Sequence, residues 1–300
     1  MKIPSRVFPY RLPYMGSKQN IAYSIMMAIA QKKPKAKYFF DIFGGGASMS
    51  LMAKQFGLKV FYTEKDGGIV NLLNFLKDNK IPKEWIKWVD REEFKRCLNK
   101  DDPYSVFVTV VWSFGNNRQA YLFGKDIEEL KRLAFEVVVH QDIRSLQRIQ
   151  DLTSVKLRMP IGKDMHNRKL DFSSQIKRIK GCSRGIKSLV NIQCLTQLER
   201  LQPLECLQQL EYLQQLEYLQ EEVIIYCDPP YRGTAEYKDN NFNPNEFDEW
   251  VRKLKYDVFI SEYNCPFKKI ASFRKMSLLN NKKEKKSLIT ENLYLHKAEV

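Results

Sequence analysis

The sequence predicts an α/β fold with a mostly parallel sheet that is interrupted by a long insertion. An apolar run at 38–43 stops at three glycines, 44–46, and helical and then strand-like residues follow. A second apolar run occurs at 223–227, after a middle region of different composition. We therefore expect one core domain whose two parts bracket an inserted region.

The first part of the chain has the pattern of one strand–helix–strand unit. Tyr38–Phe43 is a short apolar run, Ser48–Phe56 has helical composition, and Val60–Tyr62 is a second strand candidate. A crossover of this kind is right-handed and joins parallel strands. These residues predict the start of a parallel sheet.

The same alternation of strand and helix candidates returns near the end of the chain. Val223–Cys227 is continuously apolar, which is typical of a strand buried on both faces. Residues 245–254 suit a helix and residues 257–261 a further strand. We assign 1–84 and 221–300 to the core domain and 85–220 to the insertion.

The insertion contains a low-complexity repeat at 195–219, with Leu at every third position and mostly Gln and Glu between. These residue types favour helix, but a period of three drifts around a helix of 3.6 residues per turn. The unit is far shorter than the roughly 20 residues of a leucine-rich repeat. The sequence leaves the structure of the repeat, and the oligomeric state, open.

The composition excludes several classes of protein. With 44% hydrophobic residues, the chain of 300 residues is not a disordered tail, and it has no apolar run near the roughly 20 residues that span a bilayer. Six scattered Cys and three His show no metal-ligand spacing, so neither a disulfide framework nor a metal site is expected. The formal charge of +15 favours nucleic acid or an anionic surface as partner. We expect a basic, soluble, cytoplasmic protein.

The tetrapeptide Asp228-Pro229-Pro230-Tyr231 directly follows the buried strand at 223–227. Ligands of open α/β sheets bind at the carboxyl ends of strands. The prolines supply carbonyl acceptors without backbone donors, Asp228 supplies a further acceptor, and Tyr231 a flat face. This combination suits an exocyclic amino group on a planar base.

The glycine run at 44–46 lets the backbone approach a ligand closely, and the helix that follows favours negative charge at its start. Glu64, after the second strand candidate, is placed to accept hydrogen bonds from ribose hydroxyls. Taken alone, the run is equally compatible with a nicotinamide-cofactor site or a structural turn.

With these motifs the chain resembles the Dam-like DNA adenine-N6 methyltransferases of the alpha group, in particular phage-type members. Four stretches carry the resemblance: Pro13–Lys18, Phe43 with Gly45, Ile260–Tyr263 and Thr290–Leu295. It covers about 1–80 and 220–300 well. Residues 115–125 are similar to a recognition segment, and 126–220 are poorly covered.

The resemblance implies a Rossmann-like, S-adenosylmethionine-dependent methyltransferase with a mixed, mostly parallel seven-stranded sheet and an inserted target-recognition domain. It implies catalytic roles for Asp228, Pro229, Pro230 and Tyr231. It places the cofactor against Tyr14, Gly16, Lys18, Asp41, Phe43, Gly44, Gly45, Gly46, Ala47, Ser48, Glu64, Asp228 and Ser261. The candidates for contact with double-stranded DNA are Asn116, Asn117, Arg118 and Lys125.

The implied reaction is a direct displacement on a flipped adenine that stacks on Tyr231. The Asp228 carboxylate and the Pro229 carbonyl accept the two amino hydrogens, so that the nitrogen lone pair points at the methyl group. Two departures from the family pattern stand out. Ala47 replaces a frequent second glycine, and no acidic loop precedes Val223. A cytosine-N4 or RNA amino-methyltransferase, or a catalytically weakened DNA-binding relative, are the alternatives.

Overall fold

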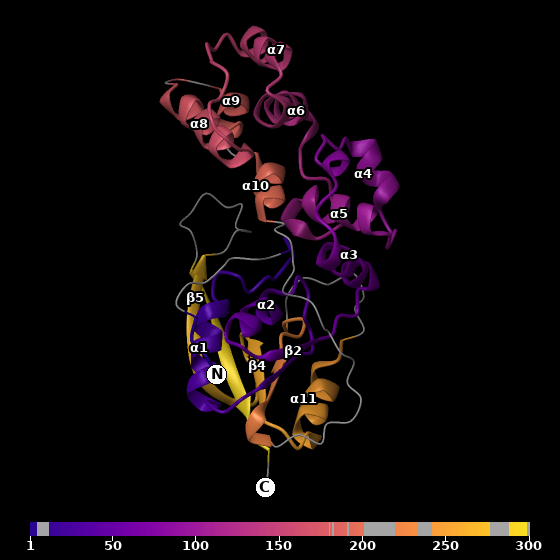
Figure 1. Ribbon diagram of the computed structural model, residues 1–300, viewed down its shortest axis with the longest axis vertical. Helices are drawn as coiled ribbons and strands as arrows, with labels where there is room; N and C mark the ends of the chain where they lie inside the picture. The colour runs from indigo at the N-terminus through magenta and orange to yellow at the C-terminus, as the bar shows by residue number, and fades with distance from the viewer. Residues whose placement is uncertain are drawn as a thin grey trace. The chain divides into compact units, whose positions relative to one another are not determined.

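A computed structural model describes residues 1–4, 12–179, 181, 183–190, 192–200, 220–232, 242–276 and 288–298. The chain divides into two compact units. We call Met1–Asp78 with Leu204–Val300 the sheet unit, and Asn79–Pro203 the helical unit (Figure 1). The sequence placed the corresponding boundaries after residues 84 and 220.

The sheet unit contains a six-stranded mixed sheet with the order β2-β1-β3-β4-β6-β5. The strands are β1 (Tyr38–Asp41), β2 (Lys59–Tyr62), β3 (Val223–Cys227), β4 (Val258–Glu262), β5 (Lys268–Met276) and β6 (Leu288–His296). The first four are mutually parallel, while β6 runs antiparallel to both β4 and β5. Pairing of β1 with β3 joins segments that are about 180 residues apart in sequence, with Asp41 opposite Tyr226.

The mostly parallel α/β sheet expected from the sequence is confirmed. The predicted strand–helix–strand unit is β1, α2 (Ser48–Gln55) and β2, and its strands are parallel. The residues that the structure describes contain six strands, one fewer than the seven predicted. Strand β5 was not predicted, because its sequence mixes Lys, Arg and Ser with apolar residues.

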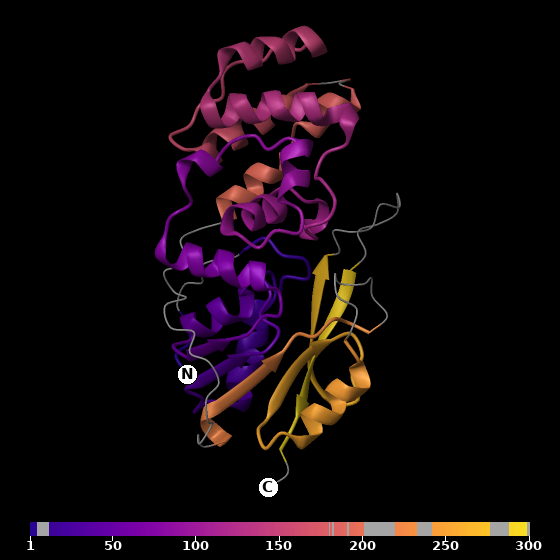
Figure 2. The same cartoon turned by 90° about the vertical axis from the view of Figure 1, so that its right-hand side faces the viewer.

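Helices cover both faces of the sheet (Figures 1 and 2). Successive residues of a strand point to opposite faces, so adjacent apolar residues serve two cores. Phe39 packs with α1 (Ala22–Lys32) and α2, whereas Phe40 packs with α11 (Pro244–Lys253). This two-sided burial explains why β3 is apolar at every position. A further helix of this unit, α3, spans Gly67–Asp78.

The helical unit contains only helices among its described regular elements. They are η1 (Lys83–Trp85), α4 (Arg91–Cys97), α5 (Pro103–Val111), η2 (Phe114–Asn116), α6 (Lys125–His140), α7 (Ile143–Thr153), α8 (Met165–Arg178), α9 (Arg184–Ser188) and α10 (Gln193–Arg200). Its centre is aromatic, because Trp112 is fully buried and its ring packs against Trp88 at 4.9 Å and Phe135 at 5.8 Å. This unit therefore has a core of its own.

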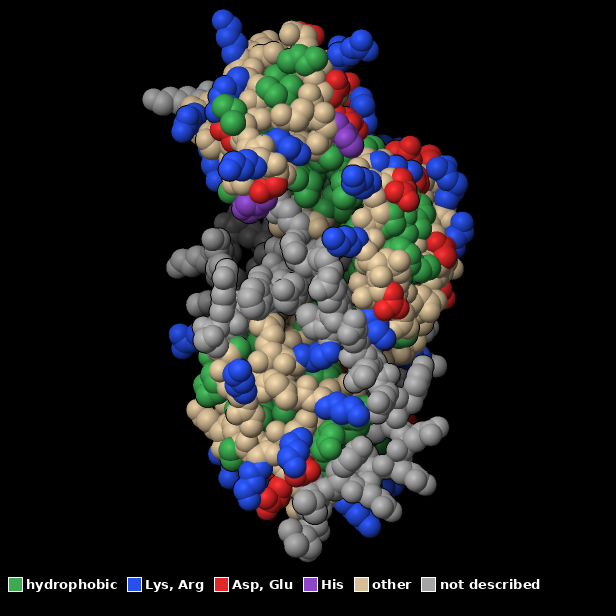
Figure 3. Space-filling view, in the orientation of Figure 1, with side chains coloured by type: hydrophobic (Ala, Val, Ile, Leu, Met, Phe, Trp, Pro, Cys, Tyr) green, Lys and Arg blue, Asp and Glu red, His purple; other side chains and the backbone are tan. Residues whose placement is uncertain are grey.

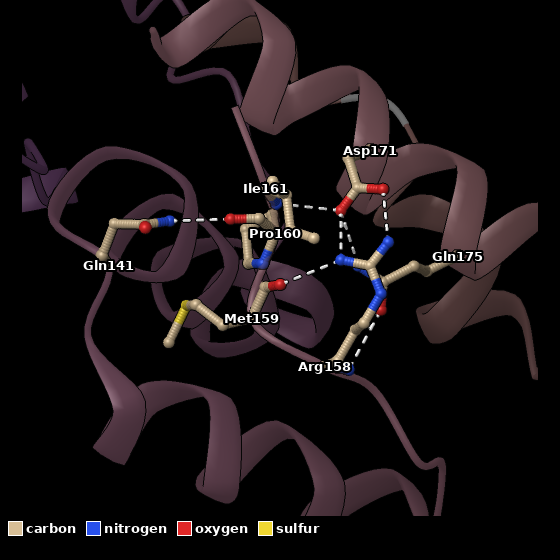
Figure 4. A network of polar contacts seen from close by, with 7 residues as sticks. All are labelled: Gln141, Arg158, Met159, Pro160, Ile161, Asp171 and Gln175. Carbon is tan, nitrogen blue, oxygen red and sulfur yellow. Dashed lines mark hydrogen bonds and ion pairs between the residues drawn. The ribbon is translucent and has the colours of Figure 1, made fainter. Parts of the chain in front are cut away.

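A polar network ties the segment that precedes α8 to that helix (Figure 4). Asp171 accepts hydrogen bonds from the Arg158 guanidinium at 2.7 and 2.9 Å and from the Ile161 backbone N–H at 3.0 Å. The Gln175 side-chain oxygen accepts from the Arg158 backbone N–H at 3.0 Å. A bidentate Arg–carboxylate pair with two backbone contacts fixes the path of a segment that has no regular structure.

The leucine repeat falls mainly outside the described residues. Its first part lies in α10, where Leu195 and Leu198 are buried. Residues 201–219 are not described, and η4 (Gln220–Glu222) leads directly into β3. In the described part of the chain, no helix is both long and apolar enough to cross a membrane.

Candidate active site at the carboxyl edge of the sheet

Four acidic side chains gather where the four parallel strands end. Asp41 and Glu262 are the last residues of β1 and β4, Asp228 directly follows β3, and Glu64 lies two residues beyond β2. Carboxyl ends of parallel strands meet at one edge of a sheet, so these groups share that edge. The site is thus acidic in a chain whose formal charge is +15.

Asp41 is buried and connects β1 to α2. One of its carboxylate oxygens accepts hydrogen bonds from the Ser50 backbone N–H at 3.0 Å and from the Ser50 hydroxyl at 2.6 Å. Burial raises the pKa of Asp41 to about 7; the Ser50 hydrogen bonds oppose this rise, while the charges of Asp228 and Glu64 add to it. Asp41, one of the predicted cofactor residues, therefore fixes the start of α2 relative to the end of β1.

The raised pKa of Asp41 predicts a pH-dependent stability. Between about pH 4 and pH 7 the folded state binds more protons than the unfolded state, so stability falls as the pH rises through 7. In the wild-type protein this group lowers the free energy of unfolding by roughly 2–3 kcal/mol between pH 5 and pH 8. The Asp41→Asn variant should lack this decrease. Urea unfolding of both proteins at the two pH values measures this difference, and equal pH dependence would contradict it.

The glycine turn is closed by Tyr62, the last residue of β2, and by Glu64, two residues further on. Gly45 has a φ of +47°, in the left-handed region that favours glycine. Its N–H donates to Glu64 at 2.7 Å, and its carbonyl accepts from the Tyr62 hydroxyl at 2.7 Å. The other Glu64 oxygen accepts from the Asp66 N–H at 2.9 Å. Glu64 thus holds the turn, while its remaining lone pairs can accept from a ligand.

Close contacts leave no room for side chains at the other two glycines of the turn. A Cβ on Gly44 would lie 2.1 Å from the Tyr62 ring, and one on Gly46 would lie 2.8 Å from the Tyr14 Cβ. Ala47, the residue after the three glycines, has a φ of +59° and is fully buried. It adopts the conformation that glycine would accept without strain.

The N-terminal motif packs on the start of α2. Gly16 has a φ of +78°, and its carbonyl accepts a hydrogen bond from the Lys18 ammonium at 3.1 Å. The hydroxyls of Ser17 and Ser48 lie 2.7 Å apart. The predicted residues Tyr14, Gly16, Lys18 and Ser48 are therefore brought to the glycine turn as one group.

Lys18 connects this group to the motif after β3. Its side chain is only 4% exposed, and Nζ lies 2.5 Å from an Asp228 carboxylate oxygen and 4.8 Å from the centre of the Tyr231 ring. Nζ also lies 3.4 Å from the fully buried Glu291 of β6. The sequence suggested no role for Glu291, which stands between Thr290 and Asn292 and so carries no local signal.

Tyr263, which directly follows β4, packs against the predicted catalytic tetrapeptide. The Tyr231 and Tyr263 rings are perpendicular, with centres 4.6 Å apart. Burial, followed by the charges of Asp228 and Glu291, raises the pKa of Tyr231 well above its usual range, so the phenol stays neutral. The predicted cofactor residue Ser261 is buried, with its hydroxyl 2.7 Å from that of Tyr226, and therefore lies within the sheet core.

The chain after Tyr231 is anchored by residues that the sequence did not single out. The Arg232 N–H donates to Glu262 at 3.3 Å, and its guanidinium reaches both carboxylate oxygens of Asp248 at 2.6 and 2.7 Å. Pro229 is buried and Pro230 half-buried. These contacts hold the predicted catalytic tetrapeptide between β4 and α11.

An aromatic cavity of about 310 Å³ opens beside the end of β1. The Phe43 ring meets those of Phe242 and Phe247 edge-on, at 5.9 and 5.8 Å between centres. Its walls are formed by Ile42, Phe43, Phe242, Asn243, Glu246, Phe247 and Trp250. Such a lining suits a flat ring that carries polar groups at its edge.

The predicted DNA-contact residues lie in the helical unit, around η2 and the start of α6. Arg118 is buried, and its Nε donates to the Thr109 hydroxyl of α5 at 3.2 Å. The Asn116 amide donates to the Val110 carbonyl, and the Asn117 side-chain oxygen accepts from two backbone N–H groups. These three residues build the turn, and the side chain of Arg118, a candidate for DNA contact, points inward to Thr109. Lys125 is exposed.

Within the described residues, no group of three or more His, Cys, Asp or Glu side chains is arranged to hold a metal ion. Comparisons with models of known protein families and with curated proteins find no match to this chain.

Proposed function

We propose that this protein is an S-adenosylmethionine-dependent methyltransferase that acts on the N6 amino group of adenine in double-stranded DNA. The observation that carries the proposal is the position of Asp228. It follows β3, next to β1 and its glycine turn, with Tyr231 close to the same Lys18 ammonium. An acceptor, an aromatic face and a backbone cradle therefore converge on one edge of the sheet.

The residues of the site fit the proposed cofactor. Burial raises the pKa of Asp41 most, and the nearby charges of Asp228 and Glu64 raise it further, so a cation bound among the three carboxylates would relieve their repulsion. The sulfonium group of S-adenosylmethionine is such a cation, and Glu64 has lone pairs for its ribose hydroxyls. The aromatic cavity beside Phe43 suits its purine. When bound, the cofactor supplies an electrophilic methyl group.

The protein's own residues would prepare the acceptor. The lone pair of the adenine amino group is delocalised into the ring, which makes that nitrogen a weak nucleophile. The Asp228 carboxylate and the Pro229 carbonyl would accept its two hydrogens and localise the lone pair on nitrogen. Tyr231, neutral because of its raised pKa, would stack on the flipped base.

The experiment for this proposal is incubation of the protein with donor carrying an isotopically labelled methyl group and with mixed-sequence duplex DNA or RNA. We expect label in the DNA, and none in a reaction without enzyme. Label in RNA alone would overturn the choice of DNA as substrate. Absence of label from both nucleic acids would overturn the proposed activity.

The charge of the helical unit supports a polyanionic substrate. It holds 24 Lys and Arg against 15 Asp and Glu. Figure 3 shows such basic side chains spread over its visible face rather than gathered in one patch. Contacts distributed in this way favour binding to the phosphate backbone.

DNA binding should therefore depend steeply on salt. Release of counterions from roughly four phosphate contacts lowers the affinity about a hundredfold between 50 and 200 mM salt. Fluorescence anisotropy with a labelled duplex measures the slope. An affinity that stays constant over this range would contradict a binding mode dominated by phosphate contacts.

A further inference from the structure

Lys18 lies between two carboxylates that differ in their access to solvent. Its Nζ is 2.5 Å from Asp228, whose side chain is 18% exposed, and 3.4 Å from Glu291, which is fully buried. Two carboxylates and one ammonium give the three groups a net charge of −1. The arrangement places an inner and an outer anion on either side of one cation.

This pairing conflicts with the acceptor role of Asp228. An ammonium at 2.5 Å draws electron density from the Asp228 oxygen that it contacts, and a charge-assisted hydrogen bond is stronger than one from a neutral amino group. The oxygen that the ammonium contacts is Oδ2, whereas Oδ1 is buried. For Oδ2 to accept from a neutral base, the ammonium needs another anion. Leaving it buried without one is strongly destabilising.

Glu291 is placed to be that second anion. A shift of less than about 1 Å would bring Nζ from 3.4 Å to the usual length of a charge-assisted hydrogen bond. Glu291 belongs to β6, which pairs with β4 directly beside the site, with Glu262 opposite Asn292. A carboxylate within a sheet strand is held in place, so the lysine is the group that moves.

We propose that Glu291 is a positioning residue that receives the Lys18 ammonium when a substrate amino group engages Asp228. The identity of that amino group rests on the proposed function; the transfer of the ammonium between the two carboxylates does not. Glu291 thereby frees Asp228 as an acceptor while the lysine stays charged and paired. No bond is made or broken in this step.

A crystal structure of Asp228→Asn tests the transfer without any activity measurement. The substitution removes the outer charge and keeps the shape of the side chain. We expect Nζ to lie within about 3.0 Å of Glu291. A lysine that stays on residue 228 or turns to solvent would overturn the proposal.

Unfolding in urea provides a second readout on the same proteins. Asp228→Asn with Glu291→Gln leaves the ammonium without an anion, so its urea midpoint should fall by more than the sum of the two single changes. Asp257→Asn, in the ion pair of Asp257 with Lys33, is the matched control that should combine additively with Glu291→Gln. Additive losses for both pairs would contradict a shared ammonium.

The kinetic test uses Glu291→Gln alone and together with Lys18→Met. The single variant should lower kcat about tenfold with the affinity for S-adenosylmethionine unchanged, because the ammonium then stays on Asp228. Removal of the lysine in that background should restore part of the rate, whereas a purely structural role predicts a further loss. If the wild-type protein transfers no methyl group to DNA, the proposed function fails, and the Asp228→Asn structure still decides the role of Glu291.

Discussion

Asp228→Ala should lower the rate of methyl transfer to DNA about a thousandfold or more, while DNA affinity changes by less than threefold. Loss of a single preorganised hydrogen-bonding group typically costs about 10²–10³ in kcat. Asp228 would in addition be the charged acceptor that localises the amino lone pair. DNA affinity, in contrast, would arise mainly from distributed Lys and Arg side chains. Single-turnover methylation and anisotropy on the same duplex measure the two quantities.

Asp257→Ala is the matched control for this comparison. Asp257 is also an aspartate of the sheet unit, its side chain is 17% exposed against 18% for Asp228, and it too pairs with a lysine, Lys33, at 2.9 Å. It lies before β4, at the opposite end of that strand from Glu262, so its loss should leave turnover near normal. Near-normal turnover of Asp228→Ala, or an equal loss in both variants, would refute the assignment of Asp228.

The second large effect is expected at the glycine turn. Gly44→Ala would place a Cβ 2.1 Å from the Tyr62 ring and 3.1 Å from the Thr63 carbonyl oxygen. The ring must move, which displaces the Tyr62 hydroxyl from the Gly45 carbonyl. We expect a loss of about 1–3 kcal/mol in the free energy of unfolding. The affinity for S-adenosylmethionine, measured by calorimetry, should fall at least tenfold.

Gly67→Ala is the control for this substitution. Gly67 is the first residue of α3, and a Cβ there would meet no atom within 4 Å. Alanine favours helix over glycine, so this variant should be as stable as the wild-type protein or slightly more stable. Equal stability and equal cofactor affinity of the two alanine variants would show that the turn does not need glycine at position 44.

The predictable parts of the fold are those in which neighbouring residues carry the signal. Strand β3 is a continuous apolar run, and β1 is apolar up to Asp41, because both faces of these strands are covered; this made them visible in the sequence. Strand β5 mixes charged and apolar residues, and the helices of the insertion have no motif comparable to the glycine run. The positions of these elements depend on tertiary contacts, which local sequence patterns do not predict.

The same distinction holds for the site. Asp228 and the glycine turn each follow an apolar strand candidate, and the resemblance assigned both to the cofactor site; the parallel pairing of β1 with β3 places them at one edge of the sheet. Glu291 comes to the site only through the antiparallel pairing of β6 with β4, which no local pattern reveals. Arg118 was a candidate for DNA contact, yet its neighbours bury it against Thr109.

The most direct test of the central claim is the identity of the methylated nucleoside. Duplex DNA is incubated with the protein and S-adenosylmethionine, digested to nucleosides and analysed by mass spectrometry. The account predicts N6-methyladenine in the wild-type reaction and its absence with Asp228→Ala. N4-methylcytosine as the product, or unmodified nucleosides at saturating donor, would contradict it.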